Sequence, residues 1–290
     1  MDIGFIGLGN MGAPMARNLA AAGYAVTGFD VAGITVEGVA SAKDAATAAG
    51  GRDLVITMLP DGAILRAVAD QILPAMRAGA TVADCSTVDV ESARAVADRA
   101  RAAGIGFVDA PVSGGIGGAE AGTLTFMAGG SAAAFDAAAP AFQVMGQKTV
   151  HCGDAGAGQA AKICNNMILG ISMIGVCEAF AMAGKLGLEA ERLFDVVSTS
   201  SGSCWSVNTY CPVPGIGPKS PADNDYRPGF AAELMLKDLR LAQAAARETG
   251  ARTELGTFAM QIYEEFVEKG GKGKDFSSLY PYFHGNGRES

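Results

Sequence analysis

The first half of the chain alternates short apolar runs with alanine-rich segments of helical character. Apolar runs of this length, bounded by glycine, proline or aspartate, are typical of buried strands. The predicted strands cover residues 3–7, 25–30, 53–59, 80–85, 106–110, 123–130 and 148–153, and the predicted helices between them cover 10–22, 61–77, 89–103 and 131–145. Because strands that alternate with helices form βαβ units, the pattern predicts an α/β fold with a mostly parallel sheet.

The pattern changes after about residue 153, where the strand signals stop. The predicted helices beyond this point cover residues 158–185, 189–200, 230–249 and 251–269. We therefore expect residues 1–155 to form the α/β domain and residues 156–290 to form an all-α domain.

The segment 204–230 separates two of the predicted helices and contains many Pro, Gly, Asn and Asp residues. No regular structure is expected to persist through so many helix and strand breakers. Long irregular loops in compact domains are usually functional, so we expect this loop, which contains Trp205, to cover a site. A purely structural Ω-loop is the alternative.

Composition narrows the class of protein. The 290 residues are 49% hydrophobic and 18% charged, which is typical of a well-packed globular protein. The net charge of −8, without any basic stripe, argues against a nucleic-acid partner and against binding to an anionic membrane surface. Residues 167–184 are apolar enough for a membrane span, but Glu178 lies within them, so we expect a buried helix there and no membrane association.

Cysteine and histidine positions bear on metal binding and on compartment. The six cysteines form no CxxC pair, and His151 and His284 lie far apart in the sequence, so no metal site is expected. Reduced thiols in the cytoplasm fit a chain of this size better than disulfides do. The first predicted strand begins almost at the N-terminus, so we expect no leader peptide.

The sequence GLGNMG at residues 7–12 follows the first predicted strand and opens a helix. Glycines in this GxGxxG pattern allow a tight turn and let the backbone approach a pyrophosphate, while the helix N-terminus attracts its charge. Asp30 ends the next strand, where its carboxylate can bind ribose hydroxyls and repel a 2′-phosphate. These features predict a Rossmann-type domain that binds NAD rather than NADP. The alternative is a glycine turn that only packs helix on strand, with Asp30 at a solvated strand end.

Polar or glycine-rich pairs follow several other predicted strands. Leu59-Pro60 and Ser86-Thr87 would lie beyond strand ends, where ligands bind in doubly wound sheets, although either pair could be an ordinary loop. Ser113-Gly114-Gly115 could direct several backbone N–H groups toward one carboxylate. A flexible turn is the alternative for this last segment.

Lys162 stands in an apolar helical segment, and Asn166 lies four residues later on the same helical face. Partial burial and the positive helix N-terminus would lower the pKa of this lysine toward the range useful for proton transfer. A snorkelling surface lysine beside a packing asparagine is the alternative. Since neither histidine has an obvious partner, Lys162 is the best candidate for the general base that hydride transfer requires.

Four motifs together resemble the β-hydroxyacid dehydrogenases. They are GFIGLGNMGAPMARNL, DAPVSGGIGGAEAGTLTFMAGG, GAGQAAKICNN and ELMLKDLRLA, and they extend from residue 4 to about residue 242. The resemblance implies an N-terminal Rossmann-type domain joined by a long helix to an all-α domain. The helix predicted at 158–185, about 40 Å long at 1.5 Å per residue, fits this joining role.

The resemblance also implies roles for individual residues. Lys162 would be the catalytic acid/base with Asn166 beside it, Ser113, Gly114 and Gly115 would hold the substrate carboxylate, and Asp238 would help to shape the site. The cofactor would be contacted by Gly7, Gly9, Asn10, Met11, Gly12, Asp30, Leu59, Pro60, Ile64 and Thr87, and on its nicotinamide side by Lys237. Family members form dimers or tetramers through the helical half, so a homodimer or homotetramer is expected.

The resemblance of the loop at 204–230 to one branch of this family implies a branched C4 hydroxyacid as the substrate. The implied reaction is NAD-dependent oxidation of 3-hydroxyisobutyrate to methylmalonate semialdehyde, a step of valine breakdown. A reductase of tartronate or succinic semialdehyde is the nearest alternative, and a non-catalytic dinucleotide-binding module, which has no need of Lys162, is a more distant one. The segment 31–41 departs from the family pattern, because it lacks an obvious helix between the second and third predicted strands.

Overall fold

The computed structural model describes residues 1–285. The chain forms two compact units, the first covering Met1–Lys162 and the second beginning at Ile163. Helix α7 (Ala157–Lys185) starts in the first unit and continues into the second. Each unit has its own hydrophobic core.

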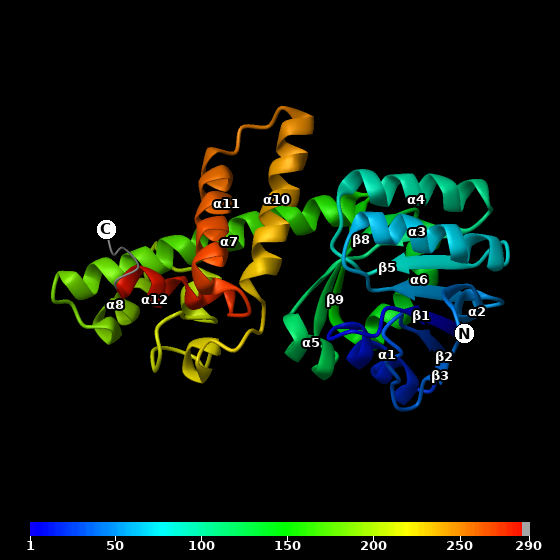
Figure 1. Ribbon diagram of the computed structural model, residues 1–290, viewed down its shortest axis with the longest axis horizontal. Helices are drawn as coiled ribbons and strands as arrows, with labels where there is room; N and C mark the ends of the chain where they lie inside the picture. The colour runs from blue at the N-terminus through cyan, green and yellow to red at the C-terminus, as the bar shows by residue number, and fades with distance from the viewer. Residues whose placement is uncertain (286–290) are drawn as a thin grey trace. The chain divides into compact units, whose positions relative to one another are not determined.

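The first unit is a nine-stranded sheet with helices on both faces (Figure 1). Its strands are β1 (Asp2–Ile6), β2 (Ala25–Phe29), β3 (Ala40–Ser41), β4 (Leu54–Thr57), β5 (Thr81–Asp84), β6 (Gly106–Asp109), β7 (Val112–Ser113), β8 (Leu124–Gly130) and β9 (Gly146–Gly153). Its helices are α1 (Gly12–Ala21), α2 (Ala45–Ala49), α3 (Gly62–Ile72), α4 (Val90–Ala102), α5 (Gly115–Ala121) and α6 (Ala132–Met145), with a 3-10 turn at Leu73–Ala75.

The strand order is β3-β2-β1-β4-β5-β6-β8-β7, with β9 paired to β8. Strands β1 to β6 pair in parallel, β8 runs antiparallel to β6 and β7, and β9 is parallel to β8. The order reverses beside β1, as in doubly wound sheets that bind ligands beyond their carboxyl ends. The prediction of a mostly parallel sheet is confirmed.

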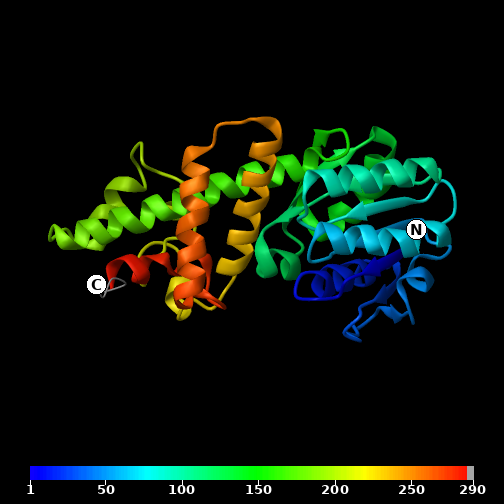
Figure 2. The same ribbon diagram turned by 45° about the horizontal axis from the view of Figure 1, so that its top comes forward.

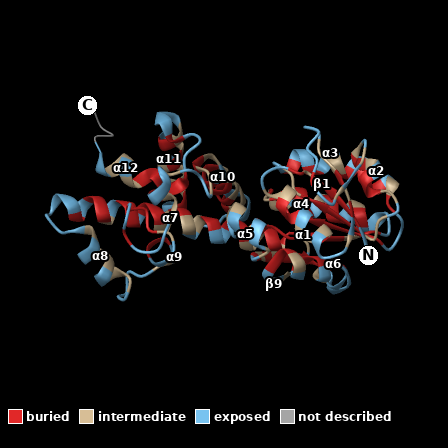
Figure 3. Cartoon of the chain, turned by 90° about the horizontal axis from the view of Figure 1, so that it is seen from below, coloured by how far each residue is buried: buried red, intermediate tan, exposed pale blue. Residues whose placement is uncertain are grey.

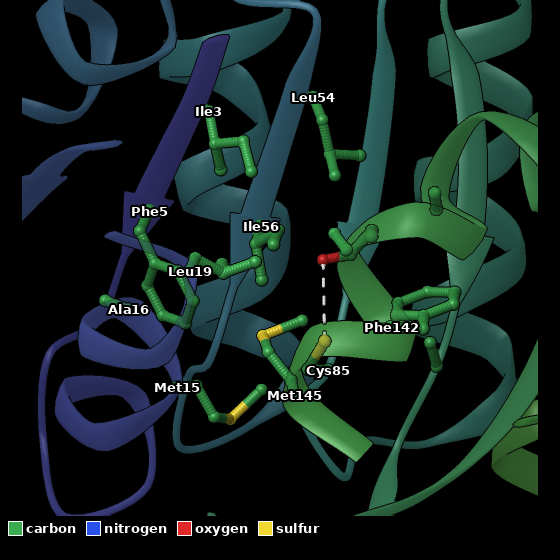
Figure 4. Packing of buried hydrophobic residues seen from close by; sticks show 14 of the residues in the cluster. Ile3, Phe5, Met15, Ala16, Leu19, Leu54, Ile56, Cys85, Phe142 and Met145 are labelled. Atoms are coloured by element: carbon green, nitrogen blue, oxygen red, sulfur yellow. Dashed lines mark hydrogen bonds between the residues drawn. The ribbon is translucent and has the colours of Figure 1, made fainter. Parts of the chain in front are cut away.

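Consecutive residues of the central strands enter different cores, because side chains alternate across a sheet. On β4, Ile56 belongs to the core under α1 and α6, whereas Val55 belongs to the core under α2, α3 and α4. Figure 4 shows Ile3, Phe5 and Ile56 of the first core facing side chains of α1 and α6. Figure 3 shows the buried residues concentrated on the strands and on the inner sides of the helices. Burial on both faces explains why these strands are continuous apolar runs rather than alternating ones.

Several helices of the first unit begin at a side-chain cap, which satisfies a backbone N–H group at the helix start. Asp44, Asp61 and Asp89 accept hydrogen bonds from the third residue of α2, α3 and α4, and Ser131 does the same for α6. These polar residues fix where each helix leaves the sheet.

The sequence missed four short elements of the first unit. Residues 31–41 contain no helix, as expected. The rest of the connection between β2 and β4 contains β3 and the short helix α2, which the sequence did not predict. Strand β7 and helix α5 lie in the glycine-rich segment 112–121. Glycine has low helix propensity, so tertiary packing rather than local sequence forms α5.

The second unit is helical, as predicted. After α7 it contains α8 (Ala190–Val197), α9 (Trp205–Asn208), a 3-10 turn at Pro221–Asn224, α10 (Ala232–Thr249), α11 (Glu254–Phe266), a π-type turn at Val267–Gly271, a 3-10 turn at Phe276–Ser278 and α12 (Leu279–His284). Figure 2 shows α10 and α11 side by side, and residues of both pack on α7 around Met173 and Cys177. Among residues 1–285, α7 is the one helix long and apolar enough to span a membrane by length and composition. Its most apolar window is 44% buried, so the helix is only partly buried, with Met173 and Cys177 in this core.

The loop 204–230 is ordered and packs on the helical unit. Cys211 and Ile216 are buried with Phe180 of α7, and the hydroxyl of Tyr210 donates to Asp275 at 2.9 Å. Two single-turn helices interrupt the expected irregular course, at Trp205–Asn208 and Pro221–Asn224. This packing agrees with the structural alternative, and coverage of a site stays a prediction.

We predict that Gly158→Ala destabilises the first unit. An added Cβ at Gly158 would overlap the carbonyl oxygens of Met127 and Asp109, so the start of α7 would have to move away from the sheet. Overpacking of this kind costs about 1–3 kcal/mol. Thermal unfolding should show a Tm lower by a few degrees to about 10 °C.

Gly117→Ala on α5 is the matched control, because an added Cβ there meets nothing within 4 Å. Its Tm should equal or exceed that of the wild type, since alanine is the better helix former. An unchanged Tm for Gly158→Ala would contradict the close packing described here.

Candidate active site

Most of the expected site residues of the first unit lie on loops that leave the sheet at one edge. The strands β2, β1, β4, β5 and β6 are parallel neighbours, so their carboxyl ends lie together. The residues that follow these ends are Gly7 after β1, Asp30 after β2, Leu59 and Pro60 after β4, Thr87 after β5, and Ser113, Gly114 and Gly115 after β6. The topology thus brings together residues that are far apart in sequence.

The turn between β1 and α1 requires its glycines. Gly7 has φ of +92°, and an added Cβ on Gly12 would overlap the carbonyl oxygen of Gly7. Around Gly9, in contrast, an added Cβ meets nothing within 4 Å, and Asn10 is also exposed. In the described part of the chain no side chain caps α1 at Met11. The start of α1 therefore offers open backbone to an anionic group, as a dinucleotide pyrophosphate requires.

Asp30 connects the end of β2 to this turn. One carboxylate oxygen accepts a hydrogen bond from the Leu8 N–H and the other from the Ala32 N–H, both at 2.7 Å. A carboxylate has about four acceptor positions, so these two bonds leave capacity for ribose hydroxyls. The carboxylate is thus fixed beside the glycine turn, as the interpretation of the sequence expects.

The loops after β4 and β5 are bonded to each other. The Leu59 N–H donates to the hydroxyl oxygen of Ser86 at 2.7 Å. Ile64, in the first turn of α3, donates its N–H to the capping Asp61 and leaves its side chain 39% exposed. Pro60 is exposed and Thr87 is half-buried. These residues form one rim along the edge where the strands end.

The segment after β6 makes a tight turn at two consecutive glycines. Ser113 ends β7 and pairs with Thr125 of β8. Gly114 and Gly115 follow with φ of +135° and +62°, values that a residue with a side chain rarely adopts. Such a turn directs successive N–H groups toward one side, which suits a carboxylate.

Lys162 lies against this segment. Its side chain is only 6% exposed, and its Nζ donates to the carbonyl oxygen of Val112 at 2.8 Å. Val112 directly precedes Ser113, so the lysine amine is held next to the Ser113-Gly114-Gly115 segment. The alternative of a snorkelling surface lysine is therefore wrong.

Two further expected residues form a buried pair in the helical unit. Asn166 of α7 donates from Nδ2 to the carboxylate of Asp238 on α10 at 2.5 Å, and its Oδ1 accepts from Asn165 at 2.9 Å. Asn166 and Asp238 are 1% and 2% exposed. Lys237, the neighbour of Asp238, is half-buried. The amide orientation of Asn166 is thus fixed by its partners.

The two histidines make hydrogen bonds or ring contacts within the fold. His151 bonds the carbonyl oxygen of Gly130 at 2.8 Å and stacks on Phe135, while His284 stacks on Tyr280. All six cysteines are free. Over residues 1–285, no group of three or more His, Cys, Asp or Glu side chains is placed to hold a metal ion.

Comparison with known proteins matches both halves of the chain. Residues 2–153 match the model of the NAD-binding domain of 6-phosphogluconate dehydrogenase, and residues 156–283 match that described as NAD-binding of NADP-dependent 3-hydroxyisobutyrate dehydrogenase. A 3-hydroxyisobutyrate dehydrogenase of Pseudomonas aeruginosa is 45% identical over 98% of this chain and 99% of its own length. The chain belongs to the β-hydroxyacid dehydrogenase family.

The names of two other relatives mention L-serine. An NAD-dependent L-serine dehydrogenase of Pseudomonas aeruginosa is 44% identical over 97% of both chains. The solved structure of 3-hydroxyisobutyrate dehydrogenase of Mycobacterium tuberculosis with L-serine superimposes with a TM-score of 0.93, at 48% identity over 96% of this chain and 97% of that one. The protein is an oxidoreductase with NAD as its cofactor, and both predictions are confirmed.

The structure adds residues of the dehydrogenase that the sequence interpretation did not single out. Asp84 and Asp109 are directly paired at the ends of β5 and β6, and both are fully buried. Gln159, in the first turn of α7, is fully buried as well. In the sequence, Asp84 and Asp109 could have been found as carboxylates at the ends of apolar strands. Gln159 lies in the GAGQAAKICNN motif, in which only Lys162 and Asn166 were assigned roles.

Asp109 holds the start of α7. Its carboxylate accepts hydrogen bonds from the N–H groups of Gly156 at 2.6 Å and Gln159 at 2.8 Å. Burial, with a smaller contribution from nearby Asp84, raises the pKa of Asp109 from 3.8 to about 7, against the opposing effect of these two N–H donors. Desolvation thus outweighs the hydrogen bonds that favour the charged form.

This raised pKa predicts a pH-dependent stability. The unfolded chain loses the Asp109 proton near pH 4, but the folded chain keeps it up to about pH 7, so this group's contribution to stability falls as the pH rises through that window. The slope from one group is at most about 1.4 kcal/mol per pH unit. Chemical denaturation between pH 4 and pH 8 should show a shallower decline for Asp109→Asn than for the wild type.

The exposed Asp136 on α6 provides the control substitution. Asp136→Asn should retain the pH dependence of the wild type. Parallel stability curves for Asp109→Asn and the wild type from pH 4 to pH 7 would refute the assignment of a proton to Asp109.

Proposed function

We propose that the protein oxidises 3-hydroxyisobutyrate to methylmalonate semialdehyde, with Lys162 as the acid/base. The observation that carries this proposal is the buried amine of Lys162, hydrogen-bonded to Val112 directly beside the Ser113-Gly114-Gly115 loop. The proposed proton acceptor, the Lys162 amine, is then adjacent to the 113–115 loop proposed to bind the carboxylate. A small β-hydroxyacid requires this proximity, because its hydroxyl and carboxylate groups are close together. Homologues with this activity support the reaction type.

Different residues of the first unit are assigned to substrate binding and to proton transfer. The loop at Ser113-Gly114-Gly115 binds the substrate carboxylate through its N–H groups. Lys162 takes the proton of the substrate hydroxyl as the C–H bond breaks. NAD, held by the glycine turn at residues 7–12 and by Asp30, would supply the hydride acceptor, so that oxidation of the hydroxymethyl carbon would give the aldehyde, NADH and one proton. Burial of the amine excludes bulk water from the proton that is transferred.

Asn166 lies one turn after Lys162 on the same face of α7. Its amide is held by Asp238, so that it can present a fixed dipole rather than a mobile side chain. We assign to Asn166 the orientation of the substrate hydroxyl, and to Asp238 the orientation of Asn166. This division follows from the hydrogen bond between the two side chains.

L-Serine is a second candidate substrate. It shares the hydroxymethyl group and the carboxylate of 3-hydroxyisobutyrate, and differs by an ammonium group in place of a methyl group. A serine dehydrogenase at 44% identity and a related structure with L-serine favour this candidate. The proposed roles of Lys162 and of the 113–115 loop are the same for both acids.

We predict that Lys162→Ala lowers kcat by about 10²–10⁴-fold, the usual contribution of general acid–base catalysis. Initial rates of NADH formation should be measured with 3-hydroxyisobutyrate and with L-serine, and with NAD and NADP separately. NADH binding, followed by fluorescence titration, should be retained, because the lysine is assigned to proton transfer.

Lys185→Ala is the matched control, since Lys185 is exposed at the other end of the same helix. Its kcat should equal that of the wild type. A wild type that binds NADH but oxidises neither acid would overturn the substrate proposal, and full activity of Lys162→Ala would overturn the catalytic role of the lysine.

We also infer a cytoplasmic homo-oligomer that associates through the helical unit. Large apolar side chains are exposed on its helices, including Leu255 and Phe258 on one face of α11, at 68% and 61% exposure. Ile168 and Met182 on α7 are exposed to a similar extent. Exposed apolar groups of this size are typical of protein–protein contact surfaces.

If so, Phe258→Glu should reduce self-association, because a charge would be placed in an apolar contact. Sedimentation velocity should show a dimer or tetramer for the wild type and a shift toward monomer for the variant. Val31→Glu, which changes an exposed valine of the first unit, should keep the wild-type assembly. A monomeric wild type would exclude the oligomer.

A further inference from the structure

The side chain of Gln159 forms a bridge that none of the roles above uses. It is fully buried in the first turn of α7. Its Oε1 accepts a hydrogen bond from the Val88 N–H at 3.1 Å, and its Nε2 donates to the carbonyl oxygen of Ser86 at 2.8 Å. These two hydrogen bonds hold the backbone in place on both sides of Thr87, which is one of the expected cofactor contacts.

The bridge continues from Ser86 to the neighbouring loop. The hydroxyl oxygen of Ser86 accepts from the Leu59 N–H at 2.7 Å, and this hydroxyl donates to the carboxylate of Asp84 at 2.5 Å. The same carboxylate oxygen accepts from the hydroxyl of Thr57 at 2.8 Å. A continuous set of buried hydrogen bonds therefore runs from α7 to the loops after β5 and β4.

The other end of the bridge is the helix that carries Lys162. Lys162 is three residues after Gln159, so the two side chains lie on the same side of α7. Lys162 is itself bonded to Val112, and Asp109 accepts the backbone N–H of Gln159. The first turns of α7 thus contact the segments after both β5 and β6.

We propose that Gln159 is a positioning residue, which keeps the Ser86–Val88 and Leu59 backbone in register with the amine of Lys162. The inference rests on the proposed function, because it assigns Lys162 to proton transfer. Hydride and proton leave neighbouring atoms of one substrate, so the cofactor loops and the lysine must keep a fixed separation. A displacement of about 1 Å can cost about 10²-fold in rate.

Glutamine is suited to this position by its chemistry. One planar amide supplies both the acceptor for Val88 and the donor for Ser86. A carboxylate would set an oxygen against the carbonyl oxygen of Ser86, whereas a protonated carboxyl would restore the donor. Methionine has nearly the same volume but supplies neither strong bond.

The test compares Gln159→Met with Gln243→Met. Gln243 is a buried glutamine of α10 whose Oε1 accepts from Thr253 and Thr257, so its loss also breaks buried hydrogen bonds. For each variant we would measure Tm, the NADH dissociation constant, kcat, and the deuterium isotope effect with substrate labelled at the hydroxymethyl carbon. Both substitutions should lower Tm.

Only Gln159→Met should change the catalytic parameters. We expect its NADH dissociation constant to rise about 5–20-fold and its kcat to fall about 10–100-fold, with a larger isotope effect because hydride transfer becomes slower. Gln243→Met should keep the wild-type values of all three. Equal behaviour of the two variants, with only Tm lowered, would overturn the proposal and reduce Gln159 to a space-filling role.

Gln159→Glu provides an independent readout, and decides the matter if Gln159→Met does not fold. The charged and titratable groups around the start of α7 are Asp84 on β5, Arg94 on α4, Asp109 on β6, Cys152 on β9 and Lys162 on α7, and all variants share them. As the pH falls from 8 to 6, the NADH affinity of Gln159→Glu should approach that of the wild type at the same pH, since protonation restores the donor. A constant deficit across this range would count against positioning by the amide.

NADH binding separates this inference from the proposed function. If the wild type oxidises neither 3-hydroxyisobutyrate nor L-serine, the substrate proposal fails, yet the dissociation constants still test whether Gln159 orders the cofactor loops. If the wild type is active and Gln159→Met binds NADH normally with unchanged kcat, the inference alone fails.

Discussion

The buried hydrogen bonds that begin helix α7 constrain the chemistry of the first unit. Asp109, at the end of β6, accepts the N–H groups of Gly156 and Gln159, so the helix starts at a point fixed by the sheet. Gly158 lies so close to the backbone of Met127 and Asp109 that only a residue without a side chain fits. Lys162 follows within two turns, and it cannot shift along the helix axis without breaking this cap.

Burial of the Asp109 carboxylate is energetically unfavourable, and this explains why the carboxylate is paired with two N–H donors. An isolated charge in this environment would be strongly disfavoured, which is why burial raises the pKa of Asp109 to about 7. The N–H groups at the helix start offset part of that cost, since they are otherwise unpaired. The start of α7 is therefore fixed at some loss of stability, which is consistent with the catalytic role proposed for Lys162.

The sequence predicted the parts of the protein that depend on local pattern. The GLGNMG turn, Asp30 and the apolar strands have spacing rules that follow from backbone geometry, and the structure places them as expected. It did not predict α5, because its helix depends on contacts rather than propensity. Nor did it predict the bridge made by Gln159, since Ser86 and Val88 are more than 70 residues away in sequence. Partners this distant are specified only once the strand order is known.

The difference between local sequence patterns and contacts of distant residues also explains why the fold and the cofactor are more readily inferred from the sequence than the substrate is. In the proposed function, the 113–115 loop and Lys162 recognise a hydroxymethyl group and a carboxylate, which 3-hydroxyisobutyrate and L-serine share. Discrimination must come from the environment of the remaining substituent. An apolar wall gains only about 0.8 kcal/mol from a methyl group, but it would leave a serine ammonium buried without a partner, at a cost of several kcal/mol. A dry wall with an acceptor binds the ammonium, but the methyl group leaves that acceptor buried and unpaired, so 3-hydroxyisobutyrate is disfavoured. Strict rejection of serine would therefore indicate an apolar wall, strict rejection of 3-hydroxyisobutyrate would indicate a dry polar wall, and acceptance of both acids would indicate a substituent that water can reach.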